Sequence, residues 1–110
     1  MRMKIWNRQK MKSITAIELQ QLMADKKDFQ LVDVREPDEH DAFNIGGALM
    51  PLAEVISHIS EIQKDRPVIV YCRKGIRSQI AIQKLQDKFP FNNLYNLTGG
   101  TEAWKKSMDG

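Results

Sequence analysis

The sequence predicts one α/β domain in which helices cover both faces of a parallel β-sheet. Segments rich in β-branched residues alternate with segments of helical period along the whole chain, an order typical of parallel sheets whose connections are helices. The chain has 110 residues, 42% of them hydrophobic, which is enough for one compact core. No repeat, low-complexity run or linker divides it into smaller units.

The first strand is expected over residues 12 to 14, and the first helix over residues 15 to 25. Thr15 and Glu18 have the spacing of a capping box, in which both side chains accept hydrogen bonds from free N–H groups at the helix start. An apolar face then continues from Leu19. The second strand is expected in the β-rich segment FQLVDV that follows.

A short acidic helix and a glycine turn are expected after this second strand, which covers residues 29 to 34. Pro37 suits the first position of a helix, and Asp38 and Glu39 suit the positive end of its dipole. Residues 44 to 50 contain two glycines and read as a turn with a brief extended piece.

An amphipathic helix is expected next, because its apolar residues follow the i, i+3, i+4, i+7 pattern. These residues are Leu52, Val55, Ile56 and Ile59, with Pro51 at the start. The apolar run RPVIVYC at residues 66 to 72 then predicts a central strand that is buried on both faces.

The last elements are a helix over residues 79 to 89, a strand over residues 93 to 97 and a short helix. Ser78 is placed to cap the first of these helices. The short helix spaces Trp104, which we expect in the core, four residues from Met108. The apolar face of the longer helix is expected to hold Ala81, Ile82, Leu85 and Phe89.

The net charge of +3 is unevenly distributed. Residues 1 to 12 hold five basic residues and no acidic one, whereas residues 13 to 110 hold 12 basic and 14 acidic residues. We therefore expect a flexible, solvated basic arm before the domain, with Met11 as an alternative start, and neither a nucleic-acid nor a membrane partner. The start resembles no secretion signal and no window suits a membrane span, so a cytoplasmic location is expected.

Cys72 is the only cysteine of the chain. A lone cysteine cannot form an intramolecular disulfide, and with only His40 and His58 beside it there is no cluster of zinc-ligand spacing. We therefore expect no metal and no cofactor, and we expect both histidines at the surface. The remaining alternatives are a buried, inert thiol and a reactive one.

The surroundings of Cys72 favour a reactive thiol. Parallel sheets bind ligands at the carboxyl ends of their strands, and Cys72 lies where a buried strand gives way to a helix. The loop N–H groups and the helix dipole would surround the sulfur, with Gly75 closing the loop and Arg73, Lys74 and Arg77 adding positive charge. Such surroundings lower a cysteine pKa from about 8.5 and make the sulfur a nucleophile.

Three motifs together resemble the single-domain rhodaneses, a family of sulfurtransferases: CRKGIR, LVDVREPDEH upstream and LTGGTEAW downstream. The resemblance covers residues 13 to 107 and places a rhodanese-like domain at residues 13 to 110. It implies a rhodanese-like three-layer fold, a parallel five-stranded sheet with helices on both faces, and a persulfide formed on Cys72. The active-site loop that it implies comprises Arg73, Lys74, Gly75, Ile76, Arg77 and Ser78.

The resemblance also implies the substrates. The donor would be thiosulfate or another sulfane-sulfur compound, with Arg73 and Arg77 orienting its oxygens and Lys74 adding charge at the rim. Because no second cysteine exists, the acceptor must be external: cyanide, glutathione, a thioredoxin-like protein or a sulfur-carrier protein. The alternative is a persulfide-carrying or regulatory module with little turnover of small molecules.

Loop length separates sulfur chemistry from phosphate chemistry. The related dual-specificity phosphatases and arsenate reductases place five residues between Cys and Arg, whereas four separate Cys72 from Arg77. A shorter loop forms a tighter ring of N–H groups, which suits one added sulfur atom better than a tetrahedral oxyanion. Sulfur transfer is therefore favoured.

Two further stretches match or depart from the family pattern. Asp33 and Arg35 match the family's DVR motif and are expected to form buried polar contacts that support the loop. In FNIGGA, Asn44 stands where the family commonly has histidine and Gly46 where it has proline. The fold should tolerate this change, and no catalytic role is assigned to Asn44.

Overall fold

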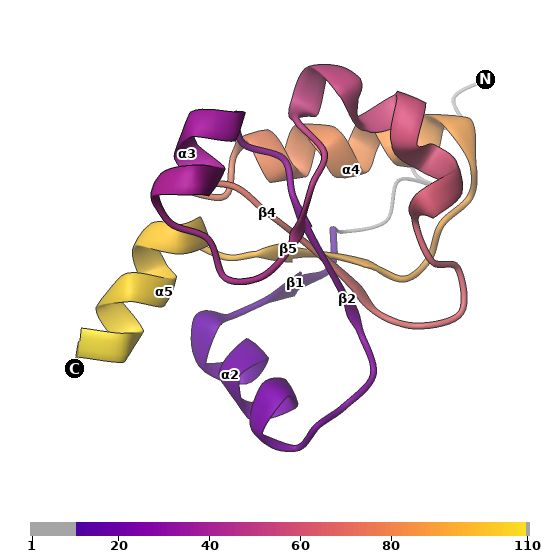
Figure 1. Ribbon diagram of the computed structural model, residues 1–110. Helices are drawn as coiled ribbons and strands as arrows, with labels where there is room; N and C mark the ends of the chain where they lie inside the picture. The colour runs from indigo at the N-terminus through magenta and orange to yellow at the C-terminus, as the bar shows by residue number, and fades with distance from the viewer. Residues whose placement is uncertain (1–10, 110) are drawn as a thin grey trace.

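Five parallel strands form one sheet in the order β1-β5-β4-β2-β3 (Figure 1). The computed structural model describes residues 11 to 109. The strands are Ser13–Ile14 (β1), Gln30–Asp33 (β2), Ala48–Leu49 (β3), Val68–Tyr71 (β4) and Leu94–Leu97 (β5). The predicted parallel α/β architecture is confirmed.

Helices cover both faces of this sheet (Figure 1). One face carries α2 and α5, which pack on each other, and the other carries α4 and the 3-10 helix η1. The bounds are Ala16–Ala24 (α2), Pro37–Ala42 (α3), Leu52–Glu61 (η1), Arg77–Lys88 (α4) and Gly100–Asp109 (α5). Within residues 11 to 109, no helix has the length and apolarity needed to cross a membrane.

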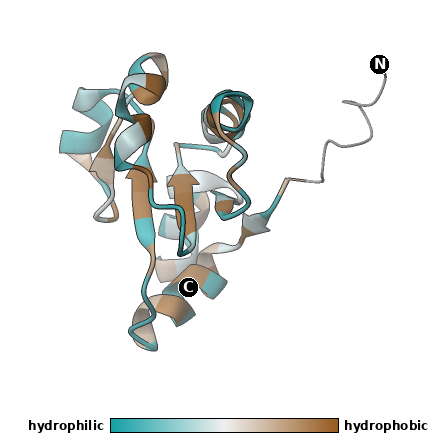
Figure 2. Ribbon diagram, turned by 90° about the vertical axis from the view of Figure 1, so that its right-hand side faces the viewer, coloured by the Kyte–Doolittle hydropathy of each residue, from teal (hydrophilic) through white to brown (hydrophobic). Residues whose placement is uncertain are grey.

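The sheet separates two hydrophobic clusters, and β4 contributes to both. Val68 and Val70 point into the cluster beneath α4, whereas Ile69 and Tyr71 point into the cluster beneath α2 and α5. All four residues of β4 are fully buried, as predicted for a central strand. Figure 2 shows these inner strands as largely hydrophobic, whereas the helices carry both hydrophilic and hydrophobic colours.

The sequence predicted the start of α2 correctly and the start of α4 incorrectly. The Thr15 side chain accepts a hydrogen bond from the Glu18 N–H at 3.1 Å and Glu18 accepts one from the Thr15 N–H at 2.9 Å, so the capping box is confirmed. The prediction that Ser78 caps α4 is wrong. The helix already begins at Arg77, and Ser78 lies buried within its first turn.

The helix that follows the glycine turn is a 3-10 helix rather than the α-helix that its apolar spacing suggested. Spacings of three and four residues fit both periods, so the pattern could not separate them. Only Val55 of this helix is fully buried.

One residue predicted on the apolar face of a helix lies outside it. Phe89 is 38% exposed, whereas Trp104 is buried as predicted. Phe89 follows the last helical residue in an extended conformation, so its side chain leaves the apolar face of α4.

Candidate active site

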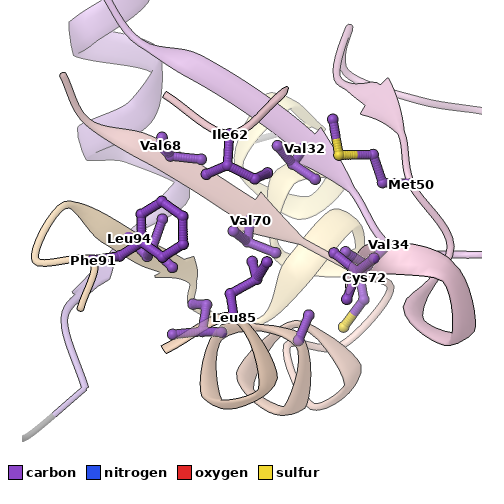
Figure 3. Packing of buried hydrophobic residues seen from close by; sticks show 13 residues of the cluster. Val32, Val34, Met50, Ile62, Val68, Val70, Cys72, Leu85, Phe91 and Leu94 are labelled. Atoms are coloured by element: carbon purple, nitrogen blue, oxygen red, sulfur yellow. The ribbon is translucent and has the colours of Figure 1, made fainter. Parts of the chain in front are cut away.

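The candidate site lies at the carboxyl end of the sheet, where the sequence placed it. Cys72 directly follows β4, and Asp33 is the last residue of the neighbouring strand β2. Figure 3 shows Cys72 at the end of the hydrophobic cluster with its sulfur turned toward a helix. The residue is only 1% exposed, so its loop must supply the polar environment of the thiol.

The loop wraps hydrogen-bond donors around the Cys72 sulfur. The Gly75 N–H donates to Sγ at 3.1 Å and the Ser78 N–H donates to it at 3.4 Å. The Ser78 hydroxyl lies 3.4 Å from the same sulfur. We call Cys72, Gly75 and Ser78 the thiol cradle, and it confirms the predicted ring of N–H groups.

The thiol cradle changes the acidity of Cys72. Burial acts to raise the pKa of the thiol, because it penalises the charged form. Hydrogen bonds from the Ser78 side chain, the Ser78 N–H and the Gly75 N–H outweigh that effect, and the pKa lies below its ordinary value. Cys72 is thus a buried cysteine whose surroundings favour the thiolate.

The start of α5 is hydrogen-bonded to the backbone carbonyl groups of the same loop. The Thr101 N–H donates to the Cys72 carbonyl at 2.9 Å, and the Glu102 N–H donates to the Arg73 carbonyl at 3.1 Å. A Cβ atom on Gly100 would lie 2.3 Å from the Cys72 carbonyl oxygen. The LTGG motif therefore lets a helix start reach the loop backbone, a role that the sequence did not reveal.

Gly75 confirms the prediction that the loop needs a backbone conformation that glycine adopts readily. Its φ is +95°, in the left-handed region that favours glycine. A Cβ atom there would lie 3.2 Å from the Gly99 nitrogen and 3.3 Å from the Leu97 oxygen. The loop is thus packed tightly against the end of β5.

Two of the three basic loop residues are ion-paired. Arg77 donates to both carboxylate oxygens of Glu39, at 2.7 and 2.9 Å, and this contact lowers the pKa of Glu39 to about 2. Arg73 donates from Nε to Glu102 at 2.9 Å on the exposed rim. Lys74 forms no ion pair within residues 11 to 109. The sequence did not anticipate either acidic partner.

Asp33, Arg35 and His40 form a buried polar cluster, the Asp33 cluster, at the end of β2. Arg35 donates from Nε to Oδ1 of Asp33 at 2.9 Å and from Nη2 to Oδ2 at 2.8 Å. Burial acts to raise the pKa of Asp33, but hydrogen bonds from Arg35 and His40 outweigh it and lower this pKa. The expected buried contact of Asp33 with Arg35 is confirmed.

His40 is not the free surface residue that the sequence suggested. Its Nδ1 lies 2.9 Å from Oδ2 of Asp33, and its side chain is 22% exposed. The cause is α3, which begins soon after β2 and turns back over the end of that strand. His58 lies on η1 and pairs with Glu61 at 2.8 Å, outside the thiol cradle.

Asn44 builds the turn in which it replaces the family's usual histidine. Its Oδ1 accepts the Gly46 N–H at 2.8 Å, and its Nδ2 donates to the His40 carbonyl at 2.9 Å. Gly46 takes a φ of +100° in this turn. The fold therefore accommodates both departures from the family pattern.

Asn96 on β5 is a site residue that the sequence did not predict. It is 5% exposed, and its Oδ1 accepts a hydrogen bond from the Ser78 hydroxyl. The available signal was a polar residue inside the otherwise apolar strand segment LYNL, where a buried amide needs a partner.

Within the described residues, no group of three His, Cys, Asp or Glu side chains could hold a metal ion.

Together these groups form an acidic thiol at the carboxyl end of the sheet, with N–H donors around its sulfur. The arrangement can hold an anionic sulfur nucleophile and can stabilise a small anionic group added to it. The hydrogen bonds to the sulfur come from two backbone N–H groups and one hydroxyl, so the thiolate depends on neutral donors.

Comparisons with known proteins agree with this description. The family model of the rhodanese-like domain matches residues 15–107. A thiosulfate sulfurtransferase of Coxiella burnetii is 36% identical over 95 residues, which cover 86% of this chain and 87% of the relative. A sulfurtransferase of Allochromatium vinosum is 39% identical over 94 residues, which cover 84% and 87% of the two chains.

Solved structures show the same likeness in three dimensions. The crystal structure of a thiosulfate sulfurtransferase from Pseudomonas aeruginosa matches with a TM-score of 0.80 and 32% identity, covering 89% of this chain and 19% of that one. A rhodanese-like domain protein from Staphylococcus aureus matches with a TM-score of 0.78 and 29% identity, covering 86% and 91% of the two chains.

Proposed function

The chain belongs to the rhodanese-like domain family, and we propose that it is a sulfurtransferase that takes a sulfane sulfur from thiosulfate as a persulfide on Cys72. The observation that carries the proposal is the thiol cradle, in which two backbone N–H groups and one hydroxyl surround a single sulfur. The relatives named as sulfurtransferases, at 36% and 39% identity, support the reaction class.

The proposed reaction is a double displacement. The Cys72 thiolate attacks the outer sulfur of thiosulfate, the sulfur–sulfur bond of the donor breaks, and sulfite leaves with the electron pair. The N–H groups of Gly75 and Ser78 then stabilise the persulfide. An external thiolate or cyanide attacks the outer sulfur, and the Cys72 thiolate leaves.

Two features favour sulfur over phosphate as the transferred group. Only four residues separate Cys72 from Arg77, and the N–H groups of the loop already point at Sγ itself. A phosphatase instead needs its arginine free to bind the phosphate oxygens, whereas Arg77 is held by Glu39 through two hydrogen bonds. We therefore propose that Lys74, on the exposed rim, supplies the first attraction for a doubly negative donor.

The test is cyanide-dependent formation of thiocyanate from thiosulfate by the purified protein. The proposal predicts turnover that a Cys72→Ser variant lacks. Equal rates for the two proteins would refute it. A stable gain of one sulfur atom without turnover would instead support a persulfide carrier that needs a protein partner. Cys72-dependent hydrolysis of an aryl phosphate, without sulfur transfer, would favour phosphatase chemistry.

A further inference from the structure

Asn96 places an amide beneath the thiol cradle, on a face of the sheet that is otherwise apolar there. Side chains of β5 alternate, so Leu94 and Asn96 face the α4 side, whereas Tyr95 and Leu97 face the opposite cluster. Asn96 lies beside Val70 in the register of the sheet. A leucine or valine would fit the pattern of this face, so the amide calls for an explanation.

The Ser78 hydroxyl stands between Asn96 and the reactive sulfur. It donates a hydrogen bond to Oδ1 of Asn96, and its oxygen lies 3.4 Å from Sγ of Cys72. All three residues are at most 5% exposed, so water does not readily replace a lost partner. A hydroxyl has one proton, and therefore it cannot donate fully to both neighbours at once.

We propose that Asn96 tunes the nucleophile by competing with the Cys72 sulfur for the hydroxyl proton of Ser78. When Cys72 is a thiol, its S–H donates to the Ser78 oxygen and the Ser78 O–H donates to Asn96. When the thiol proton has left to solvent, the Ser78 O–H turns to the anionic sulfur, and Oδ1 of Asn96 loses its donor. The amide thus favours the uncharged sulfur and keeps the thiolate more basic than the cradle alone would.

This inference extends the proposed function to its two half-reactions. A more basic thiolate is a better nucleophile toward the donor but a poorer leaving group when the acceptor removes the sulfur. After loading, the negative charge lies on the outer sulfur, so the Ser78 hydroxyl is free to return to Asn96. Asn96 is accordingly a positioning residue, which acts through Ser78 and does not touch the substrate.

Other groups also face Cys72, but Asn96 does not act through them. The N–H groups of Gly75 and Ser78 are fixed donors from the loop and from α4. Arg77 is the charged group on α4 that interacts with the thiolate, and it is held in place by Glu39 of α3. The remaining charges of the site are Arg73 and Lys74 on the loop, Glu102 on α5, and Asp33, Arg35 and His40 near the end of β2.

The test is a titration of the thiol by its rate of alkylation with iodoacetamide, which reports on Cys72 alone because the chain has no other cysteine. Asn96→Leu removes the acceptor at similar volume, so its titration midpoint should fall by about half a pH unit or more. Ser78→Ala removes the donor, so its midpoint should rise. In the Ser78→Ala background, Asn96→Leu should have no effect.

Asn96→Asp keeps the shape of the side chain and guards against failure of the leucine variant to fold. Its carboxylate holds the Ser78 proton more strongly, so the midpoint should rise, and this rise should shrink when Ser78 is alanine. Shifts of equal size in the presence and absence of the Ser78 hydroxyl, or an unchanged or raised midpoint in Asn96→Leu, would overturn the inference.

Half-reaction rates give a second measure that is separate from the thiol titration. Asn96→Leu should release sulfite from thiosulfate more slowly at alkaline pH, and it should pass the bound sulfur to cyanide faster. The unsubstituted protein and Asn96→Leu could both fail to turn over thiosulfate while the titration midpoints shift as predicted. In that case the proposed function fails and the inference about Asn96 stands.

Discussion

Two buried polar clusters lie side by side at the carboxyl end of the sheet, and they stabilise a negatively charged side chain in different ways. The thiol cradle follows β4, and the Asp33 cluster ends the neighbouring strand β2. Burial acts to raise the pKa of both Cys72 and Asp33, and in both cases hydrogen bonds reverse that effect. The difference lies in the nature of the donors.

Asp33 accepts hydrogen bonds from a cation, whereas Cys72 does not. The Arg35 guanidinium donates to both carboxylate oxygens of Asp33, so the charge of the carboxylate is neutralised and both partners are fixed. The Cys72 sulfur receives neutral donors only. Neutral donors stabilise an anion without cancelling its charge, and this leaves the sulfur able to attack an electrophile. The same position in the fold therefore yields a structural pair on one strand and a nucleophile on the next.

Removing the cation of the Asp33 cluster should have the largest effect on stability. Arg35→Met leaves the Asp33 carboxylate buried without its partner, which should lower the free energy of unfolding by about 3 to 5 kcal/mol. Urea unfolding measures this. The matched control is Arg73→Met, whose guanidinium is 62% exposed in its pair with Glu102 and should cost less than about 1 kcal/mol. Similar losses in the two variants would contradict the account.

Gly100→Ala should disturb the thiol cradle by pushing α5 against the backbone of the loop. The new Cβ would lie 2.3 Å from the Cys72 carbonyl oxygen, a backbone atom that cannot move without shifting the loop. We expect a stability loss of about 2 to 4 kcal/mol and a marked loss of sulfur transfer. Gly46→Ala is the control, because its φ is also positive but nothing lies within 4 Å of the added atom. Unchanged activity in Gly100→Ala would refute this view of the LTGG motif.

Ser78→Ala should weaken the thiol cradle without affecting the Asp33 cluster. It removes a buried hydroxyl and leaves Oδ1 of Asn96 without a donor, so we expect a stability loss of about 1 to 3 kcal/mol. The reaction with thiosulfate should need a higher pH, because the pKa of Cys72 rises. A pH–rate profile measures this, and an unchanged profile would show that the hydroxyl does not stabilise the thiolate.

Glu39→Gln should have the smallest effect at neutral pH, because its pair with Arg77 is partly exposed and contributes less than about 1 kcal/mol. The pKa of Glu39 is lowered from 4.5 to about 2 in the folded protein. The pair therefore stabilises the fold above pH 4.5, and this contribution is lost as the pH falls toward 2. Urea unfolding across that range should show a weaker pH dependence in the variant.

The same variant shows whether Arg77 binds the donor. Releasing Arg77 from Glu39 leaves its charge free at the loop, so the KM for thiosulfate should fall several-fold at low salt, and added salt should reduce the difference. Asp41→Asn is the control, since Asp41 is an exposed acidic residue of the same helix and forms no ion pair within the described residues. A raised KM would mean that Glu39 must hold Arg77 in place for binding.

Local patterns predicted much of the molecule. The order of strands and helices, the burial of β4, the capping box at Thr15 and the glycine conformation at Gly75 each depend on neighbouring residues or on simple periodicity. The Cys72 loop was also recognisable, because its features are contiguous in the sequence.

Contacts between distant elements could not be predicted in this way. Glu39 is 38 residues from Arg77, Glu102 is 29 from Arg73, and Asn96 is 18 from Ser78. Each pairing depends on how a helix lies against another helix, a strand or a loop, and no local period encodes that geometry. The basic loop residues therefore read as free charges in the sequence, although two of them are paired in the fold.

The most direct test of the central claim is the intact mass of the protein after incubation with thiosulfate and removal of the excess. We expect a gain of one sulfur atom, located on the peptide that contains Cys72 and removed by cyanide with formation of thiocyanate. An unchanged mass, a gain that cyanide does not remove, or the same gain in Cys72→Ser would contradict it.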